Sequence, residues 1–239
     1  NVGNGPSGFA FYPGTGLPDR FDGHFFMCDF LGSRWSGVRS FKLNPSGASF
    51  TLEGGAFVLR GPLATDVEFG ADGAIYVSDW VEGWVGTGKG RIFRFVHNRA
   101  KKDPLVKETQ KILQSDFGAM APARLGELLS HKNREVRQEA QFALTDMGAT
   151  GRPVLLDAAL NGDSLLARLH GVWGIGQLAR SRPGELGAIT RLLGDREPEV
   201  RAQTAKVFGD ARATGGYDAL VKMLTDDEAR PRFFAAQAL

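Results

Sequence analysis

The first hundred residues alternate short apolar runs with glycine-rich turns, a pattern that is typical of β-strands. The runs form two similar series about 50 residues apart, each opened by Gly-Pro. The first series comprises residues 9–11, 23–30 and 38–44, and the second comprises residues 67–69, 73–80 and 92–98. Asp72-Gly73, between two runs, predicts a hairpin turn. A repeat of about 50 residues built from short strands predicts β-propeller blades, of which this stretch would hold about two.

Residues 101–239 follow a helical period instead. Four arginines recur there, each eight residues after a leucine: Arg137, Arg168, Arg201 and Arg232. A small residue stands three positions after each arginine and an apolar one seven positions after, which marks one buried helix face. Pro198 stands where a second helix of a pair would begin. This period predicts an α-solenoid of about four helix pairs.

Composition separates the same two halves. Residues 1–100 hold 18 of the 32 glycines, whereas residues 101–239 hold 20 alanines against 7 in the first half. We therefore expect a multidomain protein, all-β and then all-α: propeller blades over 1–98, a linker over 99–121 and the solenoid over 122–239. Because neither end of the chain resembles a natural terminus, we expect an internal piece of a longer protein.

Charge and cysteine content exclude several classes of function. The formal net charge of +2 gives no basic surface for phosphate neutralisation, so no nucleic-acid partner is expected. No apolar run reaches the roughly 18 residues that span a bilayer, so no transmembrane segment is expected. A single cysteine, Cys28, excludes an internal disulfide and a thiolate zinc site. The four histidines show no metal-ligand spacing, and no metal site is predicted.

The run Leu192-Leu193-Gly194-Asp195, followed at 200 by Val-Arg, resembles a HEAT repeat. In that family, the aspartate and the arginine bridge successive repeats in a ladder. The resemblance implies a structural role for Asp195 and for the four arginines named above. His131 and Asp163 depart from the pattern, because the first replaces the aspartate and the second is shifted by one residue.

The first half resembles blades of the glucose and sorbosone dehydrogenase group, on residues 11–14, 70–79 and 90–95. A propeller of this kind followed by HEAT repeats resembles the membrane-bound dehydrogenases of planctomycete-type bacteria. The resemblance implies a periplasmic or cell-envelope protein that oxidises a sugar or alcohol with pyrroloquinoline quinone. It implies a haem c module outside this sequence, catalytic residues in blades outside it, and a protein partner for the HEAT repeats.

One rim of the expected blades gathers the residues best suited to hold a flat quinone or a sugar. These ligand-binding candidates are Arg34, Arg60, Asp66, Asp79, Trp80, Glu82 and Trp84. The alternative is structural: Asp29 and Asp79 would cap loop N–H groups at strand ends, and the tryptophans would pack between blades. His24 has no paired nucleophile nearby and is read as structural or merely exposed.

Two functions follow from these patterns. The first is a piece of a quinone-dependent oxidoreductase, inactive alone because it holds no nucleophile–base pair. The second is a non-catalytic scaffold that binds a protein or a glycan. The sequence alone identifies neither the substrate nor the oligomeric state.

Overall fold

The computed structural model describes residues 2–98 and 100–239 and divides the chain into two compact units. The first, here called the strand unit, comprises Asn1–Pro45 and Phe50–Gln114. The second, the helical unit, comprises Ser46–Ser49 and Ser115–Leu239. The division after Gln114 places the first α-helix in the strand unit.

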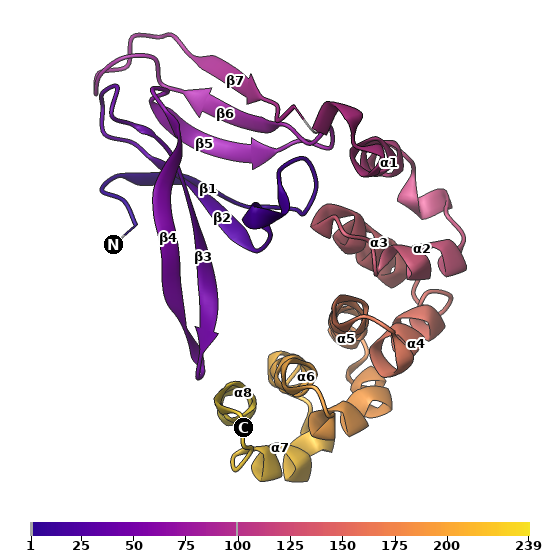
Figure 1. Ribbon diagram of the computed structural model, residues 1–239. Helices are drawn as coiled ribbons and strands as arrows, with labels where there is room; N and C mark the ends of the chain where they lie inside the picture. The colour runs from indigo at the N-terminus through magenta and orange to yellow at the C-terminus, as the bar shows by residue number, and fades with distance from the viewer. Residues whose placement is uncertain (1, 99) are drawn as a thin grey trace. The chain divides into compact units, whose positions relative to one another are not determined.

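Four strands form the first sheet of the strand unit in the order β1-β2-β3-β4 (Figure 1). Their bounds are Pro6–Phe11 (β1), His24–Asp29 (β2), Gly37–Ser46 (β3) and Ser49–Arg60 (β4), with the short 3₁₀ helix η1 at Asp19–Phe21. Side chains alternate between the two faces of a strand, so Phe26 and Cys28 of β2 are both buried. The opposite face carries contacting aromatic rings, with Phe25 stacked on both Phe9 and Phe41.

Three strands form the second sheet, again antiparallel, in the order β5-β6-β7. Their bounds are Ala64–Phe69 (β5), Ile75–Asp79 (β6) and Arg91–Phe95 (β7). The predicted hairpin turn at Asp72-Gly73 joins β5 to β6, and Gly73 has a φ of 72°. Such a left-handed φ costs glycine little, which explains this residue at the turn.

The two sheets share one core, in which β1 and β5 approach closely. Buried side chains from both sheets contribute to it: Ala10, Phe26, Cys28, Val38, Ala64, Val67, Phe69 and Val77. At the approach, a Cβ added to Gly8 would lie 2.2 Å from the Cα of Asp66. Only glycine leaves room for the two backbones there.

Helix α1, Pro104–Leu113, follows the 3₁₀ helix η2, Ala100–Lys102, and completes the strand unit. The Asp103 carboxylate accepts the Leu105 N–H at 2.9 Å and so caps the helix, with proline at the first helical position. Val106 lies against the hairpin turn, since a Cβ on Gly73 would be 3.1 Å from its Cγ1. This helix occupies residues that the sequence analysis assigned to a linker.

The helical unit is built from α-helices joined by short 3₁₀ segments (Figure 1). The bounds are Phe117–Ala119 (η3), Pro122–Leu128 (α2), Arg134–Asp146 (α3), Arg152–Asn161 (α4), Leu165–Ala179 (α5), Pro183–Gly194 (η4), Pro198–Asp210 (α6), Thr214–Gly216 (η5), Tyr217–Met223 (α7) and Ala229–Ala238 (α8). Helix α4 packs on α5, and α6 packs on α8. A Cβ on Gly171 would lie 2.4 Å from the backbone nitrogen of Ala159, so this glycine permits the close contact of α4 with α5.

The predicted fold class, propeller blades followed by an all-α superhelix, is wrong. Within the described residues the chain is mixed α/β, with two small open antiparallel sheets of four and three strands and no closed ring. Short strands separated by glycine turns specify an antiparallel meander, but they do not specify that meanders close around an axis. The strand unit is also not all-β, because α1 belongs to it.

The helical half departs from the predicted regular superhelix for a local reason. Its α-helices range from 7 to 15 residues, and the stretch Pro183–Gly194 is a 3₁₀ helix. Gly184 and Gly187 lie in that stretch, and glycine is a poor former of α-helix. The leucine–arginine spacing therefore predicted helix faces, not a uniform stack of helix pairs.

Two of the recurring arginines form bidentate ion pairs with aspartates of the following segment. Arg168 donates to both carboxylate oxygens of Asp195 at 3.0 and 2.6 Å, and Arg201 donates to both oxygens of Asp226 at 2.7 Å. Arg201 also donates to the backbone carbonyl of Asp195 at 2.7 Å. These side chains are 10–14% exposed, and the pairs link successive segments of the helical unit.

The other two arginines have no such carboxylate pair among the described residues. Arg232 donates to the backbone carbonyl of Asp226. Arg137 donates to the carbonyls of His131 and Lys132, both at 2.7 Å. All four arginines thus form hydrogen bonds within the helical unit, although only Arg168 and Arg201 pair with aspartate.

Gly8→Ala should destabilise the strand unit by about 1–3 kcal/mol, because the new methyl group would overlap backbone atoms of Asp66. Urea denaturation followed by tryptophan fluorescence measures the change. Gly90→Ala is the matched control: nothing lies within 4 Å of the Cβ there, and a shift below about 0.5 kcal/mol is expected. Equal midpoints for the two variants would contradict the close approach.

Arg201→Ala should lower the stability of the helical unit by about 1–3 kcal/mol, since Asp226 would keep a nearly buried carboxylate without its partner. The loss is read from the urea midpoint by circular dichroism at 222 nm. Arg124→Ala removes an ion pair with Glu127 that is mostly exposed, and should cost less than about 1 kcal/mol. The structural role of Arg201 is refuted if the two variants melt alike.

Candidate functional site

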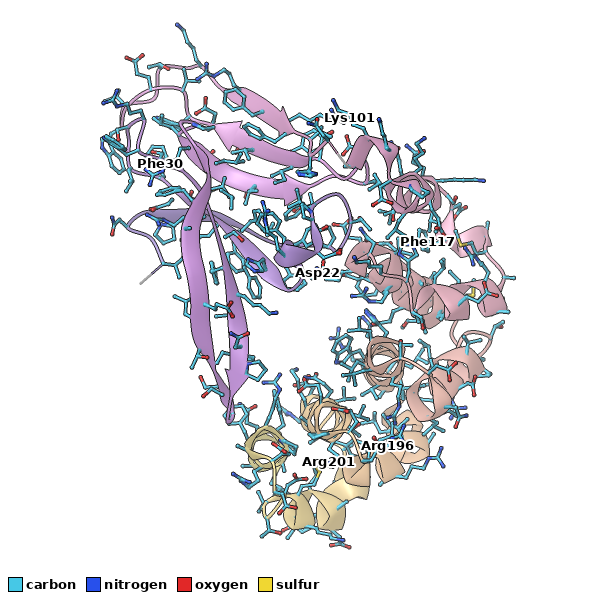
Figure 2. All side chains as sticks on the ribbon, viewed as in Figure 1. Asp22, Phe30, Lys101, Phe117, Arg196 and Arg201 are labelled. Atoms are coloured by element: carbon cyan, nitrogen blue, oxygen red, sulfur yellow. The ribbon has the colours of Figure 1, made fainter. Side chains whose placement is uncertain are left out.

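Three aromatic side chains meet at one end of the strand unit and line a shallow cleft. They are Phe30, labelled in Figure 2, together with Trp80 and Trp84. The ring centroid of Phe30 lies 5.0 Å from that of Trp84 and 6.5 Å from that of Trp80, both nearly perpendicular. The cleft has a volume of about 370 Å³, and its remaining lining residues are Gly5, Pro6, Ser7 and Thr65. We call it the aromatic cleft.

The two sheets place Phe30 and Trp80 in equivalent positions. Each residue follows directly after the middle strand of its series, β2 or β6. The backbone N–H of Phe30 donates to the Gly5 carbonyl at 2.7 Å, and that of Trp80 donates to the Leu63 carbonyl at 3.0 Å. Both rings are therefore anchored by the segment that precedes the first strand of their own sheet.

Trp84 belongs to the loop between β6 and β7 and is 71% exposed. Its indole passes close to the other sheet, because a Cβ on Gly32 would lie 2.2 Å from the Trp84 Nε1. Val81, the second residue of this loop, has a φ of 80°. A β-branched residue is strained in this region, so the loop that carries both tryptophans leaves β6 in a costly backbone conformation.

The cleft is apolar with hydroxyl groups at its edge. Ser7 Oγ donates to the Ala64 carbonyl at 3.2 Å, and Thr65 Oγ1 lies 2.9 Å from Ser78 Oγ. Within residues 2–98 and 100–239, no charged side chain lines the cleft. Its chemistry is thus suited to stacking against an uncharged ring that also carries hydroxyl groups.

Asp79, a predicted ligand-binding residue, is 3% exposed and engaged within its own unit. Its Oδ1 accepts the N–H of Leu63 at 2.7 Å and that of Val81 at 3.3 Å, while its Oδ2 accepts from Arg91 at 2.9 Å. Its geometry matches the structural alternative for this residue, the capping of loop N–H groups at a strand end.

Asp29 repeats this arrangement in the first sheet. Its oxygens accept the backbone N–H groups of Asn4 and Gly5, both at 2.9 Å, and the Arg39 side chain at 2.6 Å. Burial alone would raise the pKa of Asp29, but these hydrogen bonds outweigh it and hold the pKa below its usual range. The carboxylate therefore stays ionised and tied to the loop.

The remaining predicted candidates do not converge on the cleft. The guanidinium of Arg60 lies over the Phe57 ring at 4.0 Å, and that of Arg34 lies over Trp35 at 5.3 Å. Glu82 is exposed outside the lining. Of the seven candidates, the structure brings together Trp80 and Trp84.

Asp66 is exposed and outside the lining because of an irregularity in β5. The register against β6 shifts between Ala64 and Asp66, which changes the face that the following side chains occupy. Thr65 consequently lines the cleft, while the Asp66 carboxylate accepts only the neighbouring Val67 N–H. Strict alternation along the sequence does not reveal such a bulge.

Phe30 is a cleft residue that the sequence candidates omitted. The signal for it was present, since Phe30 follows Asp29 as Trp80 follows Asp79 in the repeated series. Cys28 is close in sequence but chemically inert, because burial raises the pKa of its thiol to about 12. Among the residues that the structure describes, no group of three or more His, Cys, Asp or Glu could hold a metal ion.

The helical unit contains a cluster of buried polar side chains, centred on His170. Its Nδ1 lies 2.7 Å from Gln141 Oε1, and its Nε2 accepts from Arg137 Nε at 3.3 Å. Because Gln141 Nε2 donates to Gln177, the network assigns the proton of the neutral imidazole to Nδ1. Burial, together with the positive charges of Arg137 and Arg134, lowers the pKa of His170 to about 4.

Comparison with known proteins gives no assignment for these sites: no protein-family model matches the chain, and no curated protein matches it. Over the described residues, no helix has the length and apolar character that crossing a bilayer requires.

Acid should destabilise the helical unit through His170. The folded pKa is about 4 and the unfolded value about 6.5, so the unfolded chain binds the proton more readily between these values. The contribution is fully present above pH 6.5 and is lost as the pH falls toward 4, by about 3 kcal/mol in total. Urea midpoints are measured between pH 7.5 and 4.5 for the chain and for His170→Gln. The difference between the two separates the contribution of His170 from that of the carboxylates. A wild-type pH dependence identical to that of the variant would exclude it.

Proposed function

We propose that this protein is a binding module that holds an uncharged sugar ring in the aromatic cleft. The observation that carries the proposal is the meeting of Phe30, Trp80 and Trp84 from two sheets, with Trp84 largely exposed. An indole ring offers a broad apolar face, which can pack against the C–H face of a sugar. The proposal corresponds to the non-catalytic glycan-binding alternative.

The edge of the cleft supports a hydroxylated ligand. Ser7 and Thr65 place hydroxyl oxygens there, and a hydroxyl can both donate and accept. Because the lining carries no charge, ionic ligands would lose solvation without gaining a partner. A neutral ring with hydroxyl groups meets both conditions.

Pyrroloquinoline quinone, the cofactor that the dehydrogenase resemblance implies, does not fit this cleft. It carries three carboxylates and would need cationic partners. Arg34 and Arg60, the predicted cations, stack on Trp35 and Phe57 instead of lining the cleft. Oxidoreductase activity, a quinone site elsewhere, an attached haem module and a location in the cell envelope all stay predictions from the resemblance.

Trp84→Ala should weaken the binding of a neutral oligosaccharide by about 1–3 kcal/mol, because it removes the exposed stacking face. The probe is a cello-trisaccharide, titrated against the ¹⁵N-labelled chain while the tryptophan indole N–H signals are followed. In the unaltered chain, the signals of Trp80 and Trp84 should shift with saturation, while that of Trp173 in the helical unit stays unchanged.

Two control variants sharpen this experiment. Trp35→Ala removes another exposed indole, 57% exposed and outside the cleft, and should leave the affinity unchanged. Asp66→Asn should also bind normally. Loss of affinity in Trp35→Ala equal to that in Trp84→Ala, or no saturable shift at all, would remove the cleft as the sugar site.

A further inference from the structure

A polar groove runs between α5 and α6 of the helical unit. One wall comes from α5, whose lining residues are one helical face: Trp173, Gly176, Gln177 and Arg180. The opposite wall and the end of the groove come from α6, the residue after it and α3: Gln203, Lys206, Val207, Asp210, Ala211 and Gln141. The groove has a volume of about 220 Å³. We call it the α5–α6 groove.

The hydrogen bonds around Gln177 fix the direction of its amide. Its Oε1 accepts from Gln141 Nε2 at 3.0 Å, and Thr145 Oγ1, which donates its one proton to the Gln141 backbone carbonyl at 2.8 Å, lies at the same 3.0 Å from it. The Nε2 of Gln177 has no partner within the described part of the chain. This half-buried side chain therefore offers two N–H donors to a ligand.

The neighbouring amide, that of Gln203, has one partner at its oxygen and one at its nitrogen. Gln203 Oε1 accepts from Trp173 Nε1 at 2.9 Å, and Gln203 Nε2 donates to Glu199 at 2.8 Å. These bonds hold the Trp173 indole in the groove wall. Of the two amides, Gln177 is thus the one whose N–H groups both lack a partner among the described residues.

The groove also carries an uncompensated positive charge. Arg180 lies one turn after Gln177, is exposed, and forms no ion pair among the described residues. The other cation, Lys206, is already paired with Asp210 at 2.5 Å. Donors that lack acceptors, beside one unpaired cation, match a ligand that presents a carbonyl and a carboxylate.

The length of the groove indicates how large this ligand is. The wall of α5 spans two turns, from Trp173 to Arg180, which is roughly 10 Å at 1.5 Å per residue. An extended peptide advances about 3.3 Å per residue, so about three of its residues cover that length. A short stretch of extended chain fits the wall better than a single small acid, which would meet only one end of it.

We propose that the α5–α6 groove binds an extended acidic segment of a partner protein. A backbone carbonyl of the segment accepts from Gln177 Nε2, and a glutamate or aspartate side chain pairs with Arg180. Trp173 forms the apolar end of the same wall. This site is independent of the sugar cleft, since it belongs to the other unit and recognises a different chemistry.

The experiment titrates the ¹⁵N-labelled full chain with acetyl-Ala-Glu-Ala-amide and follows the Trp173 indole N–H. We expect a saturable shift, and binding weaker by up to about fivefold for the matched peptide with glutamine in place of glutamate. The indoles of Trp80 and Trp84 should not move. A failure of sugar binding would thus be seen at Trp80 and Trp84, whereas a failure of this proposal would be seen at Trp173.

Variants of the chain test the two contacts. Arg180→Met should lose the preference for glutamate, whereas Arg191→Met, which removes another exposed arginine, should keep it. Gln177→Glu keeps the acceptor for Gln141 but replaces the donors, so it should weaken both peptides. Circular dichroism confirms that each variant is folded.

Three results would overturn the proposal. The first is no shift of Trp173 with either peptide. The second is an equal loss in Arg180→Met and Arg191→Met, which would indicate general charge attraction. The third is an equal shift with acetate alone at the same concentration, which would show a site for small carboxylates and not for a peptide.

Discussion

The strand unit depends on the hydrogen bonds of two buried aspartates, Asp29 at the end of β2 and Asp79 at the end of β6. Asp79 links three segments at once, because it accepts from the start of β5, from the loop after β6 and from Arg91 of β7. Asp29 does the same with Asn4, Gly5 and Arg39. A buried carboxylate is stable only when its oxygens are satisfied, so the surrounding segments have little freedom to move away. Phe30 and Trp80, which directly follow these two aspartates, are held in place by this constraint.

The helical unit also links its segments through charged side chains, but the central side chain is positive instead of negative. There the buried group is an arginine, and the satisfied partners are aspartates or backbone carbonyls from another segment. Arg137 shows what happens without an aspartate: its guanidinium turns to carbonyls and to His170, and burial lowers its own pKa to about 10. The arginine that lacks an aspartate thus joins a hydrogen-bond network with His170 and Gln141 in place of an ion pair.

The sequence predicted local features better than their arrangement. The Asp72-Gly73 hairpin and the helical faces around the repeated arginines depend on nearby residues, and the structure contains both. Closure of strands into a ring depends on contacts far apart in the chain, and the expectation of propeller blades was wrong. Similarity between the two strand series reflects a shared meander with an aspartate at the same position, which does not require a propeller.

The candidate site was likewise predicted only where local sequence determines the position of a residue. Trp80 and Trp84 lie in the cleft because the repeat placed them in one loop, but Asp66 does not, because a bulge at Thr65 shifts the face of β5. Arg34 and Arg60 lie over the rings of Trp35 and Phe57, and sequence spacing does not indicate these contacts. Phe30 was recognisable only by comparing the two series position by position.

The left-handed backbone of Val81 has a consequence for recognition. Valine has few accessible backbone conformations, and the Asp79 carboxylate accepts its N–H, so the start of the tryptophan loop is restricted before any ligand arrives. The conformational entropy of this position is lost when the chain folds. For the sugar ligand that we propose, the restriction at Val81 thus removes one loop position from the ordering that opposes binding.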